Sequence, residues 1–421
     1  MVQLNKTFDQ LSLNDRTAAS GGRSAAAKSG YKSRSAASDS SLPASTTQLL
    51  TVLSRLFSPL RNSPTFAYTL QHVKGLLYNK EYLAAFGTDS DEGERWREVY
   101  AARWVPARAV MYERILRECA VAETLQWVEA PGVRELSERE ELARERERAR
   151  SRRQARLEGR PVEDEADTPA AKDASSELET VDVVMIGAGA GSEIVALGAI
   201  LGDVATTDAA REKRPRVRVK AVDQGSWGKL LAKMEAGLQE DWPSLAQDEQ
   251  SSGGFDVAFV KGDILSTAPS PSTSAASLPA DDGAKLAQYL GIDFASPSLR
   301  LITICFTITE LLLQSRLSTL RLLSHLSRSA PRGAILLIVE SASLALIPLG
   351  KEGRTYPLGQ LLDHALCGTD TEKGAWEIVR SEDAKWYRMP EGAEEVYNGG
   401  GKGAHVKLEN SRVVLRLYKK R

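Results

Sequence analysis

The second half of the chain alternates short apolar runs with stretches of helical pattern, and this alternation limits the fold more than any other feature. Five runs rich in Val, Ile, Leu and Phe are each followed by a turn and a helix-compatible stretch: 181–186, 217–222, 255–260, 299–306 and 334–339. Runs of this kind predict parallel strands that are buried on both faces and joined by crossover helices.

Two further apolar runs, 376–379 and 412–418, close the chain, with only a Gly- and charge-rich loop around 391–402 between them. Because no helical pattern separates them, we expect an antiparallel hairpin at the edge of the sheet. The fold class is therefore α/β, a seven-stranded Rossmann-like sheet with helices on both faces, and residues 180–421 form this domain.

The first 180 residues differ in composition from the sheet region. Residues 1–45 are rich in Ser, Ala, Gly and basic residues and predict a disordered tail. Apolar residues at helical spacing over 46–130 predict a helical N-terminal segment. The Arg- and Glu-rich run and acidic stretch over 131–179 predict a charged helix and a linker. Two polar tracts, 203–215 and 266–282, are interpreted as loop insertions.

Charge and cysteine content exclude several classes of protein. The chain of 421 residues has 55 basic and 56 acidic side chains, so any surface that attracts a polyanion must be local. The three cysteines form no CxxC pair and the four histidines are scattered, which argues against a metal site or disulfide framework and favours a reducing compartment. No secretory signal or membrane span is expected.

A glycine-rich turn follows the first predicted strand. Gly187, Gly189 and Gly191 are followed by a helical run. Glycines at this place allow a tight turn and let a ligand contact backbone N–H groups at the helix N-terminus. A dinucleotide fingerprint would require glycine at Ser192, whereas G-x-G-x-G is usual in S-adenosylmethionine (SAM)-dependent methyltransferases. The spacing therefore favours SAM as the cofactor.

Carboxylates end the next two predicted strands. Asp223 is expected to accept hydrogen bonds from the ribose hydroxyls, and Asp263 from the adenine amino group. The alternative for each is a turn residue or helix cap. Since ligands of open α/β sheets bind beyond the carboxyl ends of the strands, the reaction centre is expected at the end of the fourth strand.

The fourth strand ends in a polar and aromatic segment. Thr307 and Glu310 stand in T-x-x-E register, which predicts a capping box that opens a helix over 311–323. Phe306 and Thr309 are candidates to stack on a target base and to hydrogen-bond its edge.

Cys305, just before this segment, is a candidate nucleophile, but without a partner residue the pattern favours a core cysteine. Basic and aromatic residues interleave in the helical segment, among them Lys74, Arg103 and Arg108. This mixture can contact phosphates and bases, and its alternative is an ordinary amphipathic face with snorkelling cations.

Six blocks carry a resemblance to a known family. They are VKGLLYNKEYLAAF at 73–86, ARWVPAR at 102–108, FTITEL at 306–311, YPLGQLLDH at 356–364, KWYR at 385–388 and LENSR at 408–412. With these blocks the chain resembles the fungal 25S ribosomal RNA uridine-N3 methyltransferase family over roughly residues 65–125 and 181–421. One departure is Thr309, where the family commonly has Asn.

The resemblance implies SAM-dependent methylation of N3 of one uridine in large-subunit rRNA, with the rRNA or the pre-ribosome as partner. It implies a place in the nucleus or nucleolus, leaves the cytoplasm open, and makes Lys74, Arg103 and Arg108 candidate RNA contacts. Because N3 must lose its proton before it attacks, Glu310 is the candidate base, directly or through water.

Two rival functions stay open at this point. A methyltransferase of the same fold could act on a protein or a small molecule, which the near-neutral charge would suit. A catalytically inactive ribosome-assembly factor could bind SAM without turnover. The target uridine and the oligomeric state do not follow from the sequence.

Overall fold

The computed structural model describes residues 42–127, 180–207, 214–246, 253–266, 290–349, 354–368, 374–399 and 403–421. Residues 1–41 of the tail predicted over 1–45, the whole charged helix and linker over 131–179, and much of both loop insertions lie outside these residues. Within the described part, no helix is long and apolar enough to cross a membrane.

The N-terminal part is helical, as the sequence predicts. Its helices are α2 (Ala44–Arg61), α3 (Phe66–Tyr78), α4 (Tyr82–Phe86), α5 (Asp91–Glu118) and α6 (Val121–Thr124). The long helix α5 begins where the Ser90 hydroxyl accepts a hydrogen bond from the Gly93 N–H at 3.1 Å. Asp91, Glu92 and Glu94 in its first turn add favourable charge at the positive end of the helix.

The second part alternates strands and helices. Its strands are β1 (Thr180–Ile186), β2 (Arg216–Asp223), β3 (Gly254–Lys261), β4 (Leu299–Cys305), β5 (Ile335–Ser341), β6 (Leu346–Leu349), β7 (Arg354–Pro357), β8 (Trp376–Tyr387) and β9 (Ser411–Lys420). Its helices are α8 (Ser192–Thr207), α9 (Gly228–Asp241), α11 (Ile308–Gln314), α12 (Arg316–Ser329), α13 (Leu358–Cys367) and α14 (Ala393–Asn398).

The strands form the predicted seven-stranded sheet, in the order β3-β2-β1-β4-β5-β9-β8. The first five are parallel, and β9 pairs antiparallel with both β5 and β8. The chain order reverses between β1 and β4, so the crevice for a ligand is expected beyond the carboxyl ends of these two strands. The fold class is confirmed.

Three local predictions are wrong. The loop around 391–402 contains the short helix α14, and a two-stranded hairpin, β6–β7, follows β5. The single helix expected over 311–323 is two helices, because Ser315 has extended backbone angles that end α11. Its hydroxyl then caps α12 by accepting a hydrogen bond from the Ser318 N–H at 3.2 Å.

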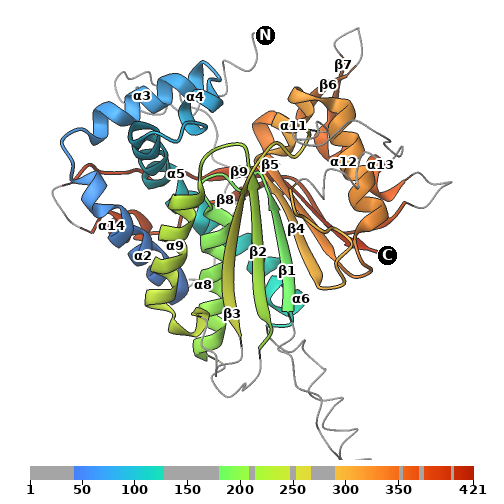
Figure 1. The fold of residues 1–421 in the computed structure, drawn as a ribbon, viewed down its shortest axis with the longest axis horizontal. Helices are drawn as coiled ribbons and strands as arrows, with labels where there is room; N and C mark the ends of the chain where they lie inside the picture. The colour runs from blue at the N-terminus through green and yellow to red at the C-terminus, as the bar shows by residue number, and fades with distance from the viewer. Residues whose placement is uncertain are drawn as a thin grey trace, which may run out of the picture.

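Each strand of the sheet centre buries both faces. Val183 and Met185 of β1 belong to one apolar core, which also contains residues of α2, α5, α8 and α9. Val184 and Ile186 point to the other side, where they pack with residues of α11, α12 and α13. Figure 1 shows these two groups of helices on opposite sides of the sheet.

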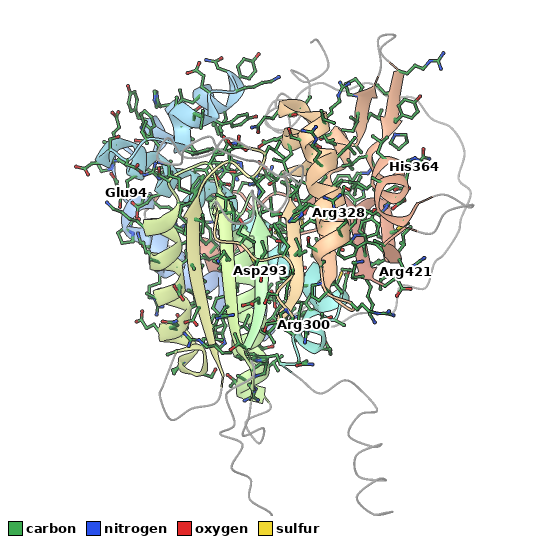
Figure 2. All side chains as sticks on the ribbon, turned by 45° about the vertical axis from the view of Figure 1, so that its right-hand side comes forward. Glu94, Asp293, Arg300, Arg328, His364 and Arg421 are labelled. Carbon is green, nitrogen blue, oxygen red and sulfur yellow. The ribbon has the colours of Figure 1, made fainter. Side chains whose placement is uncertain are left out.

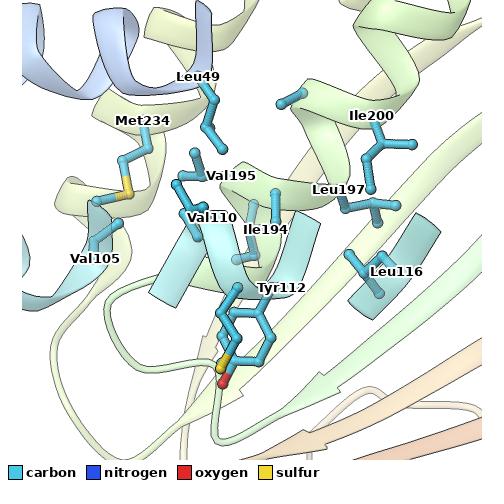
Figure 3. Close-up of a cluster of buried hydrophobic side chains, with 14 of the residues drawn as sticks. Leu49, Val105, Val110, Tyr112, Leu116, Ile194, Val195, Leu197, Ile200 and Met234 are labelled. Carbon is cyan, nitrogen blue, oxygen red and sulfur yellow. The ribbon is translucent and has the colours of Figure 1, made fainter. Parts of the chain in front are cut away.

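The helical segment shares its core with the sheet domain. Helix α5 packs against α8, and Figure 3 shows Val110, Tyr112 and Leu116 of α5 beside Ile194 and Leu197 of α8. All five side chains are buried. Ion pairs at the surface also join the helical segment to the sheet domain. Glu94 of α5 pairs with Lys229 of α9 at 2.6 Å. In Figure 2, Glu94 lies on the side of the molecule away from Arg328 and His364.

This shared core predicts one cooperative unfolding transition. Leu53 of α2 is fully buried in it, so Leu53→Ala should destabilise the protein by about 2–5 kcal/mol. Urea unfolding followed by far-UV circular dichroism and by tryptophan fluorescence should give coincident curves, both shifted. Leu83→Ala, at a position 64% exposed on α4, is the matched control and should shift neither curve appreciably. Separate transitions for helices and sheet would contradict the shared core.

Candidate active site

The loop between β1 and α8 contains the three glycines that the sequence analysis selected. Gly187, Gly189 and Gly191 have φ of +70°, +49° and +75°, in the region that favours glycine. A Cβ at Gly187 would lie 2.2 Å from Thr307 Oγ1, and one at Gly191 would lie 2.4 Å from a Leu231 methyl carbon. A Cβ at Gly189 would meet its nearest neighbours only at 3.9 Å. These are ordinary van der Waals contacts, so Gly189 is the least crowded of the three positions, and we expect a ligand to approach the backbone there.

Asp223, at the end of β2, is fixed by this loop. Its Oδ2 accepts a hydrogen bond from the Gly189 N–H at 3.0 Å. Its Oδ1 accepts from the Gly225 N–H at 2.7 Å and from Trp227 Nε1 at 3.0 Å. Burial raises the pKa of Asp223, and these three donors offset part of that effect. A carboxylate has about four acceptor positions, so one remains for a ribose hydroxyl.

Asp263 follows β3 and also has both oxygens engaged. Its Oδ1 accepts a hydrogen bond from the Leu265 N–H at 2.9 Å, and its Oδ2 accepts from Gln314 Nε2 at 2.8 Å. The first bond is the turn role that the sequence analysis held as the alternative. The second ties the β3 end to α11. A contact with adenine stays a prediction.

Phe306, directly after β4, has φ +54°, which is rare for a bulky residue. Its N–H donates to the Val339 carbonyl at 2.7 Å, which holds the backbone in place. Its ring lies edge-on to Tyr112 with centroids 6.3 Å apart, and the guanidinium carbon of Arg108 lies 5.3 Å from its centroid. A strained position that its surroundings maintain is a marker of functional sites.

The capping box predicted at Thr307 and Glu310 is wrong. Among the described residues, the Thr307 hydroxyl makes no cap bond and instead donates to two backbone carbonyls, at 3.0 and 3.2 Å. The start of α11 is capped from β5, because the Thr309 N–H donates to Glu340 Oε2 at 3.1 Å. With the cap supplied by Glu340, the Glu310 carboxylate is not required for the helix.

Glu310 therefore has an ionisable carboxyl beside the strand ends. It is accessible to solvent, yet protein surrounds much of it. This partial burial raises the pKa of Glu310 to about 7, with further increases from Glu340 and Asp223 and an opposing effect of Arg108. A pKa near neutrality suits a group that accepts a proton under physiological conditions.

The helical segment supplies the other side of the site. Arg108 of α5 donates from Nη1 to Tyr100 Oη at 2.8 Å, and its guanidinium lies 5.8 Å from the Tyr100 ring centroid. Burial, followed by the charge of Glu310, raises the pKa of Tyr82 to about 12, so Tyr82 of α4 also lies near that carboxylate. Residues from α4, α5 and the β4 end thus meet in one place.

Aromatic contacts join this place to the glycine loop. Trp227 donates to Asp223, and its ring centroid lies 4.7 Å from that of Phe86 and 5.8 Å from that of Tyr100. Tyr100 in turn contacts Arg108. The contacts run without interruption from the candidate ribose ligand to the candidate substrate site.

Thr309 and Glu340 lie beneath the start of α11. The Thr309 side chain is buried, and its hydroxyl makes no hydrogen bond of normal geometry within the described structure, although it lies close enough to lower the pKa of Glu340. Burial is the larger effect and raises the pKa of Glu340. A contact between Thr309 and a substrate stays a prediction.

Cys305 is a core cysteine, as the sequence analysis favoured. Burial, followed by the charge of Glu193, raises the pKa of Cys305 well above that of a free thiol, which suppresses the nucleophilic thiolate. Burial also raises the pKa of Glu193 to about 7, while the Thr303 hydroxyl donates to its Oε1 at 2.8 Å. In the part of the chain that is described, no cluster of His, Cys, Asp and Glu is arranged to hold a metal ion.

The three candidate RNA contacts occupy different environments. Lys74 is exposed on α3, the helix that also exposes Tyr68 and Tyr78. Arg103 pairs with Glu409 and donates to a backbone carbonyl near it at 3.0 Å, so it ties α5 to the C-terminal segment. Arg108 lies in the site itself.

Sequence reasoning missed several residues of the site. Glu340 is the last residue but one of β5, close to the strand end as Asp223 is in β2, and the same strand-end rule could have selected it. Tyr100 and Arg108 lie eight residues apart on one face of α5, but nothing in the sequence shows that this face covers the strand ends. No sequence pattern marks Tyr82 or Glu193 as a residue of the site.

The residues present fit SAM. The glycine loop leads into the N-terminal end of α8, where backbone N–H groups favour a polar ligand, and a Cβ at Gly189 would make only ordinary van der Waals contacts. Asp223 retains acceptor capacity for a ribose hydroxyl next to that loop. SAM supplies an electrophilic methyl group on a sulfonium.

Comparisons with known proteins identify a relative of the whole chain. A curated relative from Saccharomyces cerevisiae, 25S rRNA (uridine(2843)-N(3))-methyltransferase, is 27% identical over 366 residues, which cover 83% of this chain and 77% of the relative.

Among solved structures, a SAM-dependent methyltransferase from Methanosarcina mazei is 13% identical with a TM-score of 0.29, covering 57% of this chain and 93% of that one. A 16S rRNA (adenine(1408)-N(1))-methyltransferase from Catenulisporales acidiphilia is 10% identical with a TM-score of 0.27, covering 58% and 86%. TM-scores this low support no argument about function.

Residues 53–419 match the model of a family described as "Putative SAM-dependent methyltransferase". The match includes the helical segment, the glycine loop and the whole sheet. The chain belongs to this family of SAM-dependent methyltransferases.

Proposed function

We propose that this protein transfers the methyl group of SAM to N3 of a uridine in large-subunit ribosomal RNA. The observation that carries the proposal is the Glu310 carboxyl, which is free of capping, has a pKa near 7 and lies at the end of β4 beside Arg108. The yeast relative, named for methylation of uridine N3 in 25S rRNA, supports the same acceptor atom.

The chemistry of N3 requires such a carboxyl. N3 of uracil carries a proton and becomes a nucleophile only when that proton leaves. Glu310 in its ionised form accepts the proton, directly or through water. Phe306 offers a ring face on which the base stacks, which places N3 for in-line approach to the methyl group.

The acceptor atom also restricts the RNA. N3 lies on the Watson–Crick edge, so the uridine must be unpaired or extruded before it can enter the site. An early assembly intermediate of the large subunit meets this requirement. Such a substrate would place the protein in the nucleus or nucleolus, with the pre-ribosome as its partner.

Mapping of the modified uridines in 25S rRNA tests the function directly. Mass spectrometry should find one N3-methyluridine that is lost when the gene is deleted, and the purified protein with labelled SAM should restore it on rRNA from the deletion strain. Label on a protein fraction alone would favour a protein acceptor. SAM binding without turnover on any RNA would favour an inactive assembly factor.

The first prediction concerns SAM binding. Asp223→Ala removes the acceptor of the Gly189 N–H and the expected ribose contact, so it should weaken SAM binding roughly 10- to 100-fold. Isothermal calorimetry measures this affinity. Asp182→Ala removes a strand carboxylate at the opposite end of the sheet and should leave it unchanged. Equal affinities of Asp223→Ala and the wild type would remove Asp223 from the site.

The second prediction concerns the base. Because only the ionised Glu310 can accept the proton, wild-type kcat/KM should rise with pH through an apparent pKa of about 7. Glu310→Gln should lower kcat/KM by about 10²–10⁴ and abolish this dependence while SAM binding persists. Glu92→Gln, in the first turn of α5, is the control. A wild-type profile retained in Glu310→Gln would exclude Glu310 as the base.

The third prediction concerns the RNA surface. Lys74 is exposed on α3. If it contacts a phosphate, Lys74→Ala should weaken RNA binding and reduce the slope of log K against log salt by about 0.7–0.9. Binding titrations over a range of salt concentrations measure this slope. Lys419→Ala, near the C-terminus and across the molecule from α3 in Figure 1, should leave it unaltered. Identical slopes for the wild type, Lys74→Ala and Lys419→Ala would show that Lys74 contacts no phosphate and lies on an ordinary solvated helix face.

A further inference from the structure

Arg108 is a cation without a carboxylate at ion-pair distance among the described residues. By contrast, Arg416, a buried arginine elsewhere in the fold, pairs with Asp363 at 3.1 Å and Asp383 at 2.7 Å. Arg108 instead donates one hydrogen bond to Tyr100 and lies 5.3 Å from the Phe306 ring centroid. A guanidinium has five N–H donors, so Arg108 retains donors for a ligand that carries negative charge.

The reaction creates such a charge beside Phe306. When uracil loses its N3 proton, the negative charge spreads over N3 and the two flanking carbonyl oxygens, O2 and O4. We propose that Arg108 is a catalytic residue that donates a hydrogen bond to one of these oxygens and stabilises the uracil anion. This role rests on the proposed function, and it makes Arg108 a second catalytic residue beside Glu310.

The step balances between the two groups. The N3–H bond breaks, the proton joins a carboxylate oxygen of Glu310, and the electron pair stays on the base. The N3–CH₃ bond then forms as the S–CH₃ bond of the sulfonium breaks, and sulfur keeps that electron pair. Arg108 remains charged throughout. Its hydrogen bond to Tyr100 holds the guanidinium in place, so its charge stabilises the anion as the anion forms.

The same pair of groups selects the base. An acceptor, Glu310, next to a donor, Arg108, matches the N3–H donor and O4 acceptor of uracil. Cytosine presents an acceptor at N3 and a donor amino group at position 4, so both contacts would be mismatched. Arg108 lies 5.3 Å from the Phe306 ring centroid, and Glu310 follows Phe306 in the first turn of α11, so we expect both groups to contact a base stacked on Phe306.

A comparison of two RNAs separates anion stabilisation from RNA binding. One is the rRNA fragment that contains the modified uridine, and the other is the same fragment transcribed with 5-fluorouridine triphosphate. Fluorine withdraws electrons and makes N3–H more acidic, so the anion needs less help from the enzyme. Single-turnover methyl transfer is measured for the wild type, Arg108→Met and Arg108→Lys, with SAM affinity measured in parallel.

The matched control is Arg114→Met. Arg114 lies on the same helix, is partly buried, and has its guanidinium 5.5 Å from the Tyr387 ring centroid, away from the site. The Arg114→Met variant should transfer methyl groups to both RNAs at the wild-type rate. It shows how far the rate changes when α5 simply loses a positive charge.

We expect Arg108→Met to slow transfer about 10²–10³-fold on the uridine RNA and at least tenfold less on the fluorinated RNA, with SAM affinity unchanged. Arg108→Lys should fall between, and it replaces Arg108→Met in the comparison if the latter is below detection or fails to fold. Equal defects on both RNAs, or no defect, would overturn the role of Arg108 alone. Absence of N3 methylation by the wild-type enzyme on both RNAs would overturn the proposed function and this role with it.

Discussion

The packing of α5 against α8 is the constraint on which the rest of the structure depends. Every residue of α8 from Ile194 to Leu201 is buried. Because the sheet can cover only one side of this helix, another element must cover its outer side. Helix α5 covers its outer face. Because Val110 and Leu116 must point into α8, the 3.6-residue period of α5 brings Arg108 and Tyr112 over the strand ends. A single hydrophobic interface therefore stabilises the fold and positions the cation of the site.

The cofactor loop and the substrate side are not independent either. Thr307 donates to the Gly187 carbonyl, and any side chain at Gly187 would collide with Thr307. The turn after β1 and the turn after β4 are thus locked together. The left-handed backbone of Phe306 lies directly between β4 and this contact. In the proposed function, the distance from a methyl donor on the glycine loop to a base on Phe306 is therefore set by the backbone, which holds it more precisely than contacts between flexible side chains would.

The sequence was sufficient to predict the sheet and insufficient to predict the composition of the site. Strands β1, β4 and β5 carry a nearly continuous apolar signal because both faces are buried, so their existence was predictable. The capping box at Thr307 and Glu310 was mispredicted, since a residue 31 positions from Thr309 supplies the cap and no local pattern records that. Arg108 was recognised as a notable cation, but its partner ring at Phe306 is nearly 200 residues away in the sequence. Local patterns report local structure, and the site is made of long-range contacts.

The charge balance of the site gives Arg108 its importance. Glu340 and Asp223 raise the pKa of Glu310, and burial raises the pKa of all three carboxyls. Without a cation, the approach of an electron-rich uracil anion to these carboxylates would be opposed by repulsion in a medium of low dielectric constant. Arg108 opposes these effects, because its charge lowers the pKa of both Glu310 and Glu340. In the proposed reaction, this one guanidinium from the helical segment would meet two requirements: it leaves Glu310 able to take the N3 proton, and it stabilises the uracil anion that remains.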